Sequence, residues 1–142
     1  MWKHLMWAAA ALVLAACASS APQLRDMRTG LLAPCAGVRD CVGSQDGGVE
    51  PIRYSGPLGE ARGKMGRVLL RMKVYQIVRD EGDYILATRS DGHSAETLEL
   101  VFSQREPGVV HVRSSGGGGL FGLGNNREHV EDLRRAFTIA KS

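Results

Sequence analysis

The stretch ETLELVFSQREPGVVHVRSS, residues 96–115, decides the fold because its pattern specifies two strands and the turn between them. Apolar and polar residues alternate from Glu96 to Ser103 and again from Val109 to Ser114. Alternation with a period of two is typical of strands that bury one face. Pro-Gly is a turn signal, so residues 104–108 are predicted to close a β-hairpin.

This loop also predicts the register of the two strands, because a shift by one residue would mismatch both faces at once. Charged residues pair on one face, and apolar residues pair on the other. Whether the charged pair is exposed or buried under the glycine-rich loop that follows stays open. The expected pairs are Ser103–Val109, Phe102–Val110, Val101–His111, Leu100–Val112, Glu99–Arg113 and Leu98–Ser114.

The flanking sequence extends the hairpin into a small domain. Residues 73–79 and 84–90 alternate like strands on either side of the turn DEGD, and residues 49–54 are a candidate short strand. Apolar residues recur at helical spacing in residues 55–72 and again after Asn125. We therefore predict an α+β fold: a four-stranded antiparallel meander sheet with two helices, one before and one after it, packed on one face.

The run GGGGLFGLG, residues 116–124, invites a comparison with phosphate-binding loops. A P-loop needs Lys and then Ser or Thr after its last glycine, but Asn125 and Asn126 follow Gly124. A dinucleotide fingerprint needs a parallel βαβ unit, which the predicted meander lacks. We expect a connection ended by a capping box of Asn125 and Glu128, with an anion assisted by Arg127 at the helix N-terminus as the functional alternative.

The N-terminus has the features of an export signal. Lys3 and His4 precede an apolar stretch too short to span a membrane, which ends in Leu-Ala-Ala-Cys. This tetrapeptide resembles a bacterial lipobox, so residues 1–16 are predicted to be a lipoprotein signal peptide and Cys17 to carry acyl chains such as palmitate. Residues 17–33 would form a lipidated tether and residues 34–142 a single domain. The alternative is ordinary signal-peptidase cleavage. Ala18, which is not aspartate, favours the outer membrane.

Two further cysteines, Cys35 and Cys41, stand close together in PCAGVRDC. Because an oxidising periplasm favours pairing, we expect a disulfide between them. A metal site is the alternative, but no histidine lies nearby, so we expect no metal. The formal charge of +3 comes from basic residues spread along the chain with few aromatics between them. Nucleic-acid binding is therefore not expected.

The segments PCAGVRDCVGSQ, VEPIRY, HVRSS and GLGNNREHVEDLR together resemble the uncharacterised family called domain of unknown function 1499 (DUF1499), over about residues 34–137. The resemblance supplies no activity. It implies a candidate polar cluster of Glu99, Arg113, Ser114, Asn126, Arg127 and Glu131. Members usually carry an arginine, an aromatic residue and an aspartate where this chain has Gly117, Leu120 and Gly122, which indicates a divergent member. The matching positions are Pro34, Cys35, Cys41, Val42, Ser44, Pro51, Glu99, Arg113, Ser114, Gly119, Gly124, Asn126, Arg127, Val130 and Glu131.

Two functions follow from these features. The first is a bacterial envelope lipoprotein that binds or scaffolds an envelope protein or ligand without catalysis or a cofactor, facing the periplasm from the outer membrane. The second is a periplasmic enzyme, hydrolase-like, that uses Glu99, His111 and Arg113 on the polar sheet face, where a glutamate and a histidine could act as acid and base.

Overall fold

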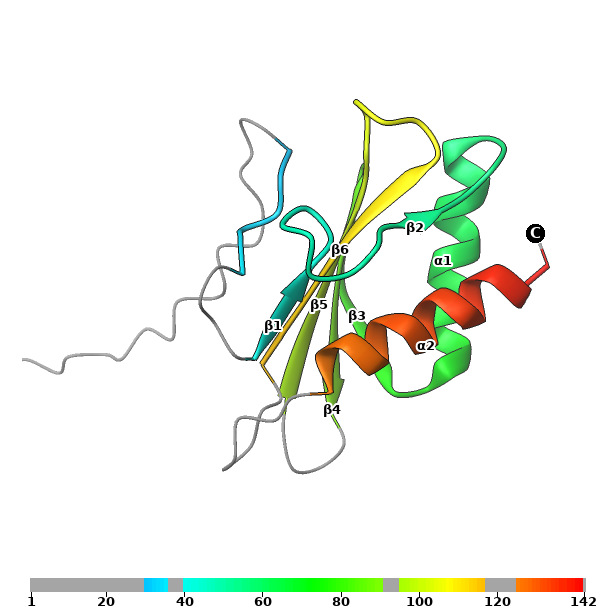
Figure 1. The fold of residues 1–142 in the computed structure, drawn as a ribbon. Helices are drawn as coiled ribbons and strands as arrows, with labels where there is room; N and C mark the ends of the chain where they lie inside the picture. The colour runs from blue at the N-terminus through cyan, green and yellow to red at the C-terminus, as the bar shows by residue number, and fades with distance from the viewer. Residues whose placement is uncertain (1–29, 36–39, 91–94, 117–124, 142) are drawn as a thin grey trace, which may run out of the picture.

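The computed structural model describes residues 30–35, 40–90, 95–116 and 125–141. The fold is α+β, with an antiparallel sheet and two helices that lie on one side of it (Figure 1). Outside the described residues lie the predicted signal peptide, Cys17, most of the predicted tether and the glycine-rich residues 117–124. The elements are β1 (Cys41–Gly43), β2 (Ile52–Arg53), α1 (Leu58–Met72), β3 (Tyr75–Glu81), β4 (Tyr84–Ser90), β5 (Ala95–Phe102), β6 (Val109–Gly116) and α2 (Asn126–Ile139).

The predicted meander is present, since β3, β4, β5 and β6 pair in sequence order and antiparallel. The predicted hairpin register is confirmed: Phe102 faces Val110 and Glu99 faces Arg113. Ser103 donates its backbone N–H to the Val109 carbonyl at 2.9 Å, as the predicted loop requires. Gly108 closes the loop with a φ of +81°, a conformation that glycine adopts without a steric cost.

The strand count was wrong, because the described sheet has six strands rather than four. Both additional strands pair with β6: β1 along its C-terminal half and β2 at its start. One helix precedes the meander and one follows it, as predicted, but α1 does not precede the whole sheet, because β1 and β2 come before it in the chain. The candidate strand at residues 49–54 is present only as Ile52 and Arg53.

The hydrophobic core lies between the helices and what we call the inner face of the sheet. Leu98, Leu100 and Phe102 of β5 point to this face and are almost fully buried. The helices add apolar stripes at three- and four-residue spacing. Their buried residues are Ala61, Met65, Val68 and Leu69 in α1, and Val130, Leu133 and Phe137 in α2.

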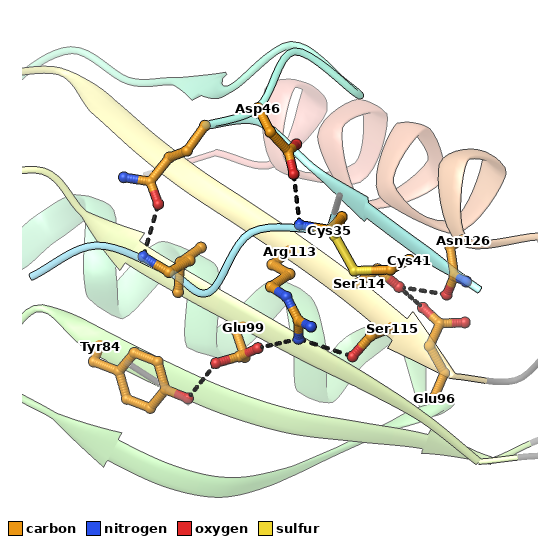
Figure 2. A network of polar contacts seen from close by, with 12 residues as sticks. Cys35, Cys41, Asp46, Tyr84, Glu96, Glu99, Arg113, Ser114, Ser115 and Asn126 are labelled. Atoms are coloured by element: carbon orange, nitrogen blue, oxygen red, sulfur yellow. Dashed lines mark hydrogen bonds and ion pairs between the residues drawn. A yellow bond between two sulfur atoms is a disulfide. The ribbon is translucent and has the colours of Figure 1, made fainter. Parts of the chain in front are cut away.

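The opposite, outer face of the sheet is not open to solvent along its whole length. Residues 30–35, which we call the covering segment, run over it (Figure 2). Leu32 is buried there in a second small core with Tyr84, Leu86 and Val101. The last residues expected to be tether are thus packed on the fold.

The start of α2 differs in detail from the prediction. Asn125 is the N-cap residue, but its side chain makes no capping hydrogen bond. The next residue, Asn126, turns its side chain into the protein and is buried. Along the helix, Glu131 pairs with Arg134 at 3.0 Å, and Arg135 pairs with Asp132.

Candidate functional site

The outer face carries a buried polar group, the outer-face cluster, made of Tyr84, Glu99, Arg113 and Ser115 (Figure 2). Arg113 donates from Nη1 to Glu99 Oε2 at 2.8 Å and to Ser115 Oγ at 3.0 Å. The Tyr84 hydroxyl donates to Glu99 Oε1 at 3.1 Å. The Glu99 side chain is 0% exposed and that of Arg113 13%. The charged pair is therefore buried rather than exposed, but the segment seen above it is the covering segment, and the glycine-rich residues 117–124 lie outside the described residues.

Burial controls the electrostatics of this cluster. Loss of solvent raises the pKa of Glu99 above its ordinary value of 4.5, while the hydrogen bond and charge of Arg113 act in the opposite direction. Burial, and then the charge of Glu99, also raise the pKa of the Tyr84 hydroxyl. Because both Glu99 oxygens already accept hydrogen bonds, this carboxylate is held as a structural partner of Arg113.

Specific contacts hold the covering segment in place above the cluster. The Leu32 N–H donates to Gln45 Oε1 at 2.7 Å, and the Cys35 N–H donates to Asp46 Oδ2 at 2.7 Å. The predicted Cys35–Cys41 disulfide is confirmed, with Cα atoms 5.4 Å apart, and this bond excludes the alternative of a metal site at these two cysteines. A hollow of about 290 Å³ remains between the covering segment, the turn at residues 43–46 and Arg113.

A second polar group, the inner cluster, lies where α2 begins, and it contains Glu96, Ser114, Asn126 and His129. The Ser114 hydroxyl lies 2.5 Å from Glu96 Oε1 and 2.7 Å from Asn126 Oδ1, and it has one proton to donate to them. His129 Nδ1 contacts the other oxygen of Glu96 at 2.5 Å. Glu96 thus lies between the serine and the histidine, whereas a serine nucleophile needs the imidazole beside it. Ser114 is also 0% exposed.

A third group, the hairpin relay, links Ser44, His111 and Glu106. The Ser44 hydroxyl lies 3.1 Å from His111 Nδ1, and His111 Nε2 lies 2.6 Å from Glu106 Oε2. In the tautomer with a proton on Nε2, the Ser44 hydroxyl donates to the imidazole of His111, and this imidazole donates to the Glu106 carboxylate. This is the order of nucleophile, base and orienting carboxylate in a catalytic triad. Ser44 Oγ also accepts the Val112 N–H at 2.9 Å.

The polar cluster expected from the sequence is therefore divided. Glu99 and Arg113 meet on the outer face, and Ser114 and Asn126 meet on the inner face. Arg127 is exposed on α2, and Glu131 belongs to an ion pair whose arginine, Arg134, also donates to the Pro51 carbonyl at 2.7 Å. His111, expected beside Glu99 and Arg113, forms its hydrogen bonds with Ser44 and Glu106 instead.

Comparison with known proteins identifies the family of this chain. Residues 14–137 match the family described as "Protein of unknown function (DUF1499)". The chain belongs to the DUF1499 family. A search of curated proteins and a search of solved structures each gave no match. The match to DUF1499 covers the sheet, α1 and almost all of α2, so all three polar groups lie within it.

The described part of this DUF1499 chain contains neither a cluster of metal-binding side chains nor a helix that could span a membrane. Within residues 30–35, 40–90, 95–116 and 125–141, no three His, Cys, Asp or Glu side chains gather as they would around a metal ion. In the same residues, no helix has the length and apolar character needed to cross a membrane.

Proposed function

We propose that this chain is the precursor of a bacterial envelope lipoprotein, anchored through acyl groups on Cys17 and facing the periplasm from the outer membrane. The sequence of residues 1–17 supports the anchor, and the Cys35–Cys41 disulfide is consistent with an oxidising compartment. Acylation would contribute about 0.8 kcal/mol for each methylene buried in the membrane, so more than one chain on Cys17 would make a stable anchor.

We further propose that the domain is a non-catalytic binding or scaffolding module. The observation that carries this proposal is that the buried polar side chains contact one another. Glu99 and Arg113 neutralise each other beneath the covering segment, and Ser114 is buried against Glu96. Groups engaged in this way support a rigid sheet, and they are not free to exchange protons with a substrate.

The anchor is tested by expressing the full chain and a Cys17→Ala variant in a bacterium supplied with an alkyne analogue of palmitate. The unaltered chain is expected to carry the label and to sediment with outer-membrane fragments. Cys17→Ala should be unlabelled and should remain a precursor or appear in the soluble fraction. Equal labelling and fractionation of the two proteins would refute the lipoprotein proposal.

One observation favours a second candidate, a periplasmic hydrolase. The hairpin relay has the connectivity of a nucleophile, base and acid, with Ser44 as nucleophile, His111 as base and Glu106 as the group that orients the imidazole. The Ser44 backbone N–H is engaged by the Val112 carbonyl at 2.9 Å, so it is not available to stabilise an oxyanion. This contact is why we prefer the binding module.

A fluorophosphonate reagent, which phosphonylates activated serines with loss of fluoride, separates the two functions. Labelling at Ser44 that is lost in His111→Ala but kept in His129→Ala would establish the hydrolase. An unlabelled protein supports the module. His129→Ala is the matched control, because it removes a histidine that also contacts a glutamate.

A further inference from the structure

Among the described residues, the last turns of α1 and α2 line a groove. Both helices lie on the same side of the sheet (Figure 1). Its volume is about 490 Å³, within the range of sites for small ligands. Most of its lining is aliphatic, and the charged residues that contribute are both basic. The lining residues are Val68, Arg71, Met72, Ala136, Ile139, Ala140 and Lys141.

The charge on the α1 side of this groove has one sign. From residue 61 to residue 73 the chain carries Arg62, Lys64, Arg67, Arg71 and Lys73 and no acidic residue. Arg62 is paired with Asp80, and Lys64 lies over the Phe137 ring at 4.6 Å. Arg67, Arg71 and Lys141 are exposed, and no carboxylate among the described residues forms an ion pair with them. The groove therefore presents cations toward solvent.

Exposed apolar side chains stand beside these cations. Ile139 is 82% exposed and Leu70 is 64% exposed, which makes them the two most exposed large apolar residues that the structure describes. On α1, Leu70 lies next to Arg71 and three positions from Arg67. Aliphatic side chains combined with basic ones are the pattern of protein surfaces that lie in the membrane interface.

We propose that this groove docks the domain onto an anionic phospholipid surface, with Arg71 and Lys141 contacting headgroup phosphate and Ile139 and Leu70 entering the acyl region. The proposal rests on the proposed function, in which the Cys17 anchor keeps the domain at a membrane. Between Cys17 and Gly30 the chain can span at most about 45 Å. A domain of this size has a radius of gyration of about 13 Å, so the tether is long enough for the helix side to reach the lipid.

The test uses the chain from Ala18 onward, which contains every described residue but lacks the anchor. Cosedimentation is measured with vesicles of phosphatidylglycerol mixed with phosphatidylcholine and with vesicles of phosphatidylcholine alone. We expect binding to the anionic vesicles only, weakened by added salt. Each cation near an anionic surface contributes about a fivefold factor in affinity. The double variant Arg71→Gln/Lys141→Gln should therefore bind about 25-fold more weakly.

The matched control is Arg79→Gln/Arg105→Gln, which removes the same charge at exposed positions on β3 and the hairpin loop. This control should bind within about twofold of the unaltered chain. Ile139→Asp tests the apolar contribution and should weaken binding to anionic vesicles. All variants should show unchanged thermal unfolding.

Equal losses in the two double variants would overturn the proposal, as would the absence of binding to anionic vesicles. Binding of poly-glutamate without vesicle binding would also overturn it and would indicate an acidic protein partner. Because the test protein lacks Cys17, its result is independent of whether the native chain is acylated. A failure of docking is therefore distinguishable from a failure of the lipoprotein proposal.

Discussion

Replacing Arg113 with alanine should destabilise the fold more than any other arginine substitution on the hairpin. The change removes the hydrogen bond from Nη1 to Glu99, and it leaves a carboxylate that is 0% exposed with only the Tyr84 hydroxyl as a partner. Removing one member of a buried ion pair costs about 3 to 5 kcal/mol. A small domain has a total stability of about 5 to 15 kcal/mol, so the loss is a large fraction of it.

The effect of Arg113→Ala should depend on pH, and the sign follows from Glu99. Its pKa is raised in the folded protein, so above the ordinary value of 4.5 the folded state holds a proton that the unfolded state has lost. Stability therefore falls as pH rises through this window. Arg113 lowers the pKa of Glu99, so this pKa rises further in Arg113→Ala, and the pH range over which only the folded state holds the proton becomes wider. The loss of stability caused by Arg113→Ala should therefore be smaller at about pH 4 than at about pH 7.

Urea unfolding followed by circular dichroism measures both effects. Arg105→Ala is the matched control, because Arg105 is exposed in the hairpin loop and its loss should change stability by less than about 0.5 kcal/mol. The double variant Glu99→Leu/Arg113→Met should recover most of the stability, since apolar residues can replace a buried pair at little cost. Equal, small losses in Arg113→Ala and Arg105→Ala, without pH dependence, would refute the reasoning.

Further predictions follow from the disulfide and from two glycines. Removing the disulfide with Cys35→Ser/Cys41→Ser should lower the free energy of unfolding by about 2 kcal/mol, because its small ring restricts the unfolded chain; denaturant melts with and without reductant check this. Gly66→Ala should stabilise the protein by about 1 kcal/mol, because a Cβ there meets open space on a helix, and a lower melting temperature would contradict it. Gly108→Ala should instead destabilise by about 1 to 3 kcal/mol, because its Cβ would lie 2.9 Å from the Tyr54 carbonyl oxygen at a φ of +81°; the same melts measure it.

The hairpin could be predicted from the sequence because two independent constraints agree. The apolar alternation determines which residues face the core, and the Pro-Gly loop determines which residues face each other. A slip of one residue would have moved Leu98 and Leu100 from the hydrophobic core to the outer face and Glu99 to the core. The Glu99–Arg113 pair followed from this register, although its burial did not, because the covering segment comes from a distant part of the chain.

The strands β1 and β2 could not be predicted from alternation as the hairpin was, because they are too short to show a period. Cys41–Gly43 pairs with Arg113–Ser115, far along the chain, and nothing local indicates this partner. The hairpin relay was missed for the same reason. Its Glu106–His111 half lies across the predicted hairpin loop and could have been found from the register, but Ser44 reaches His111 only because β1 pairs with β6.

The disulfide also determines how the fold bears tension. Any pull on the chain upstream of Gly30 first acts on the covering segment, which is held by Leu32 and two hydrogen bonds from its backbone. Beyond Cys35, the covalent bond transfers the load directly to Cys41, and from there to the backbone hydrogen bonds between β1 and β6. A moderate force would therefore peel residues 31–34 from the sheet and uncover Arg113, while the disulfide acts as a mechanical stop that keeps the sheet intact.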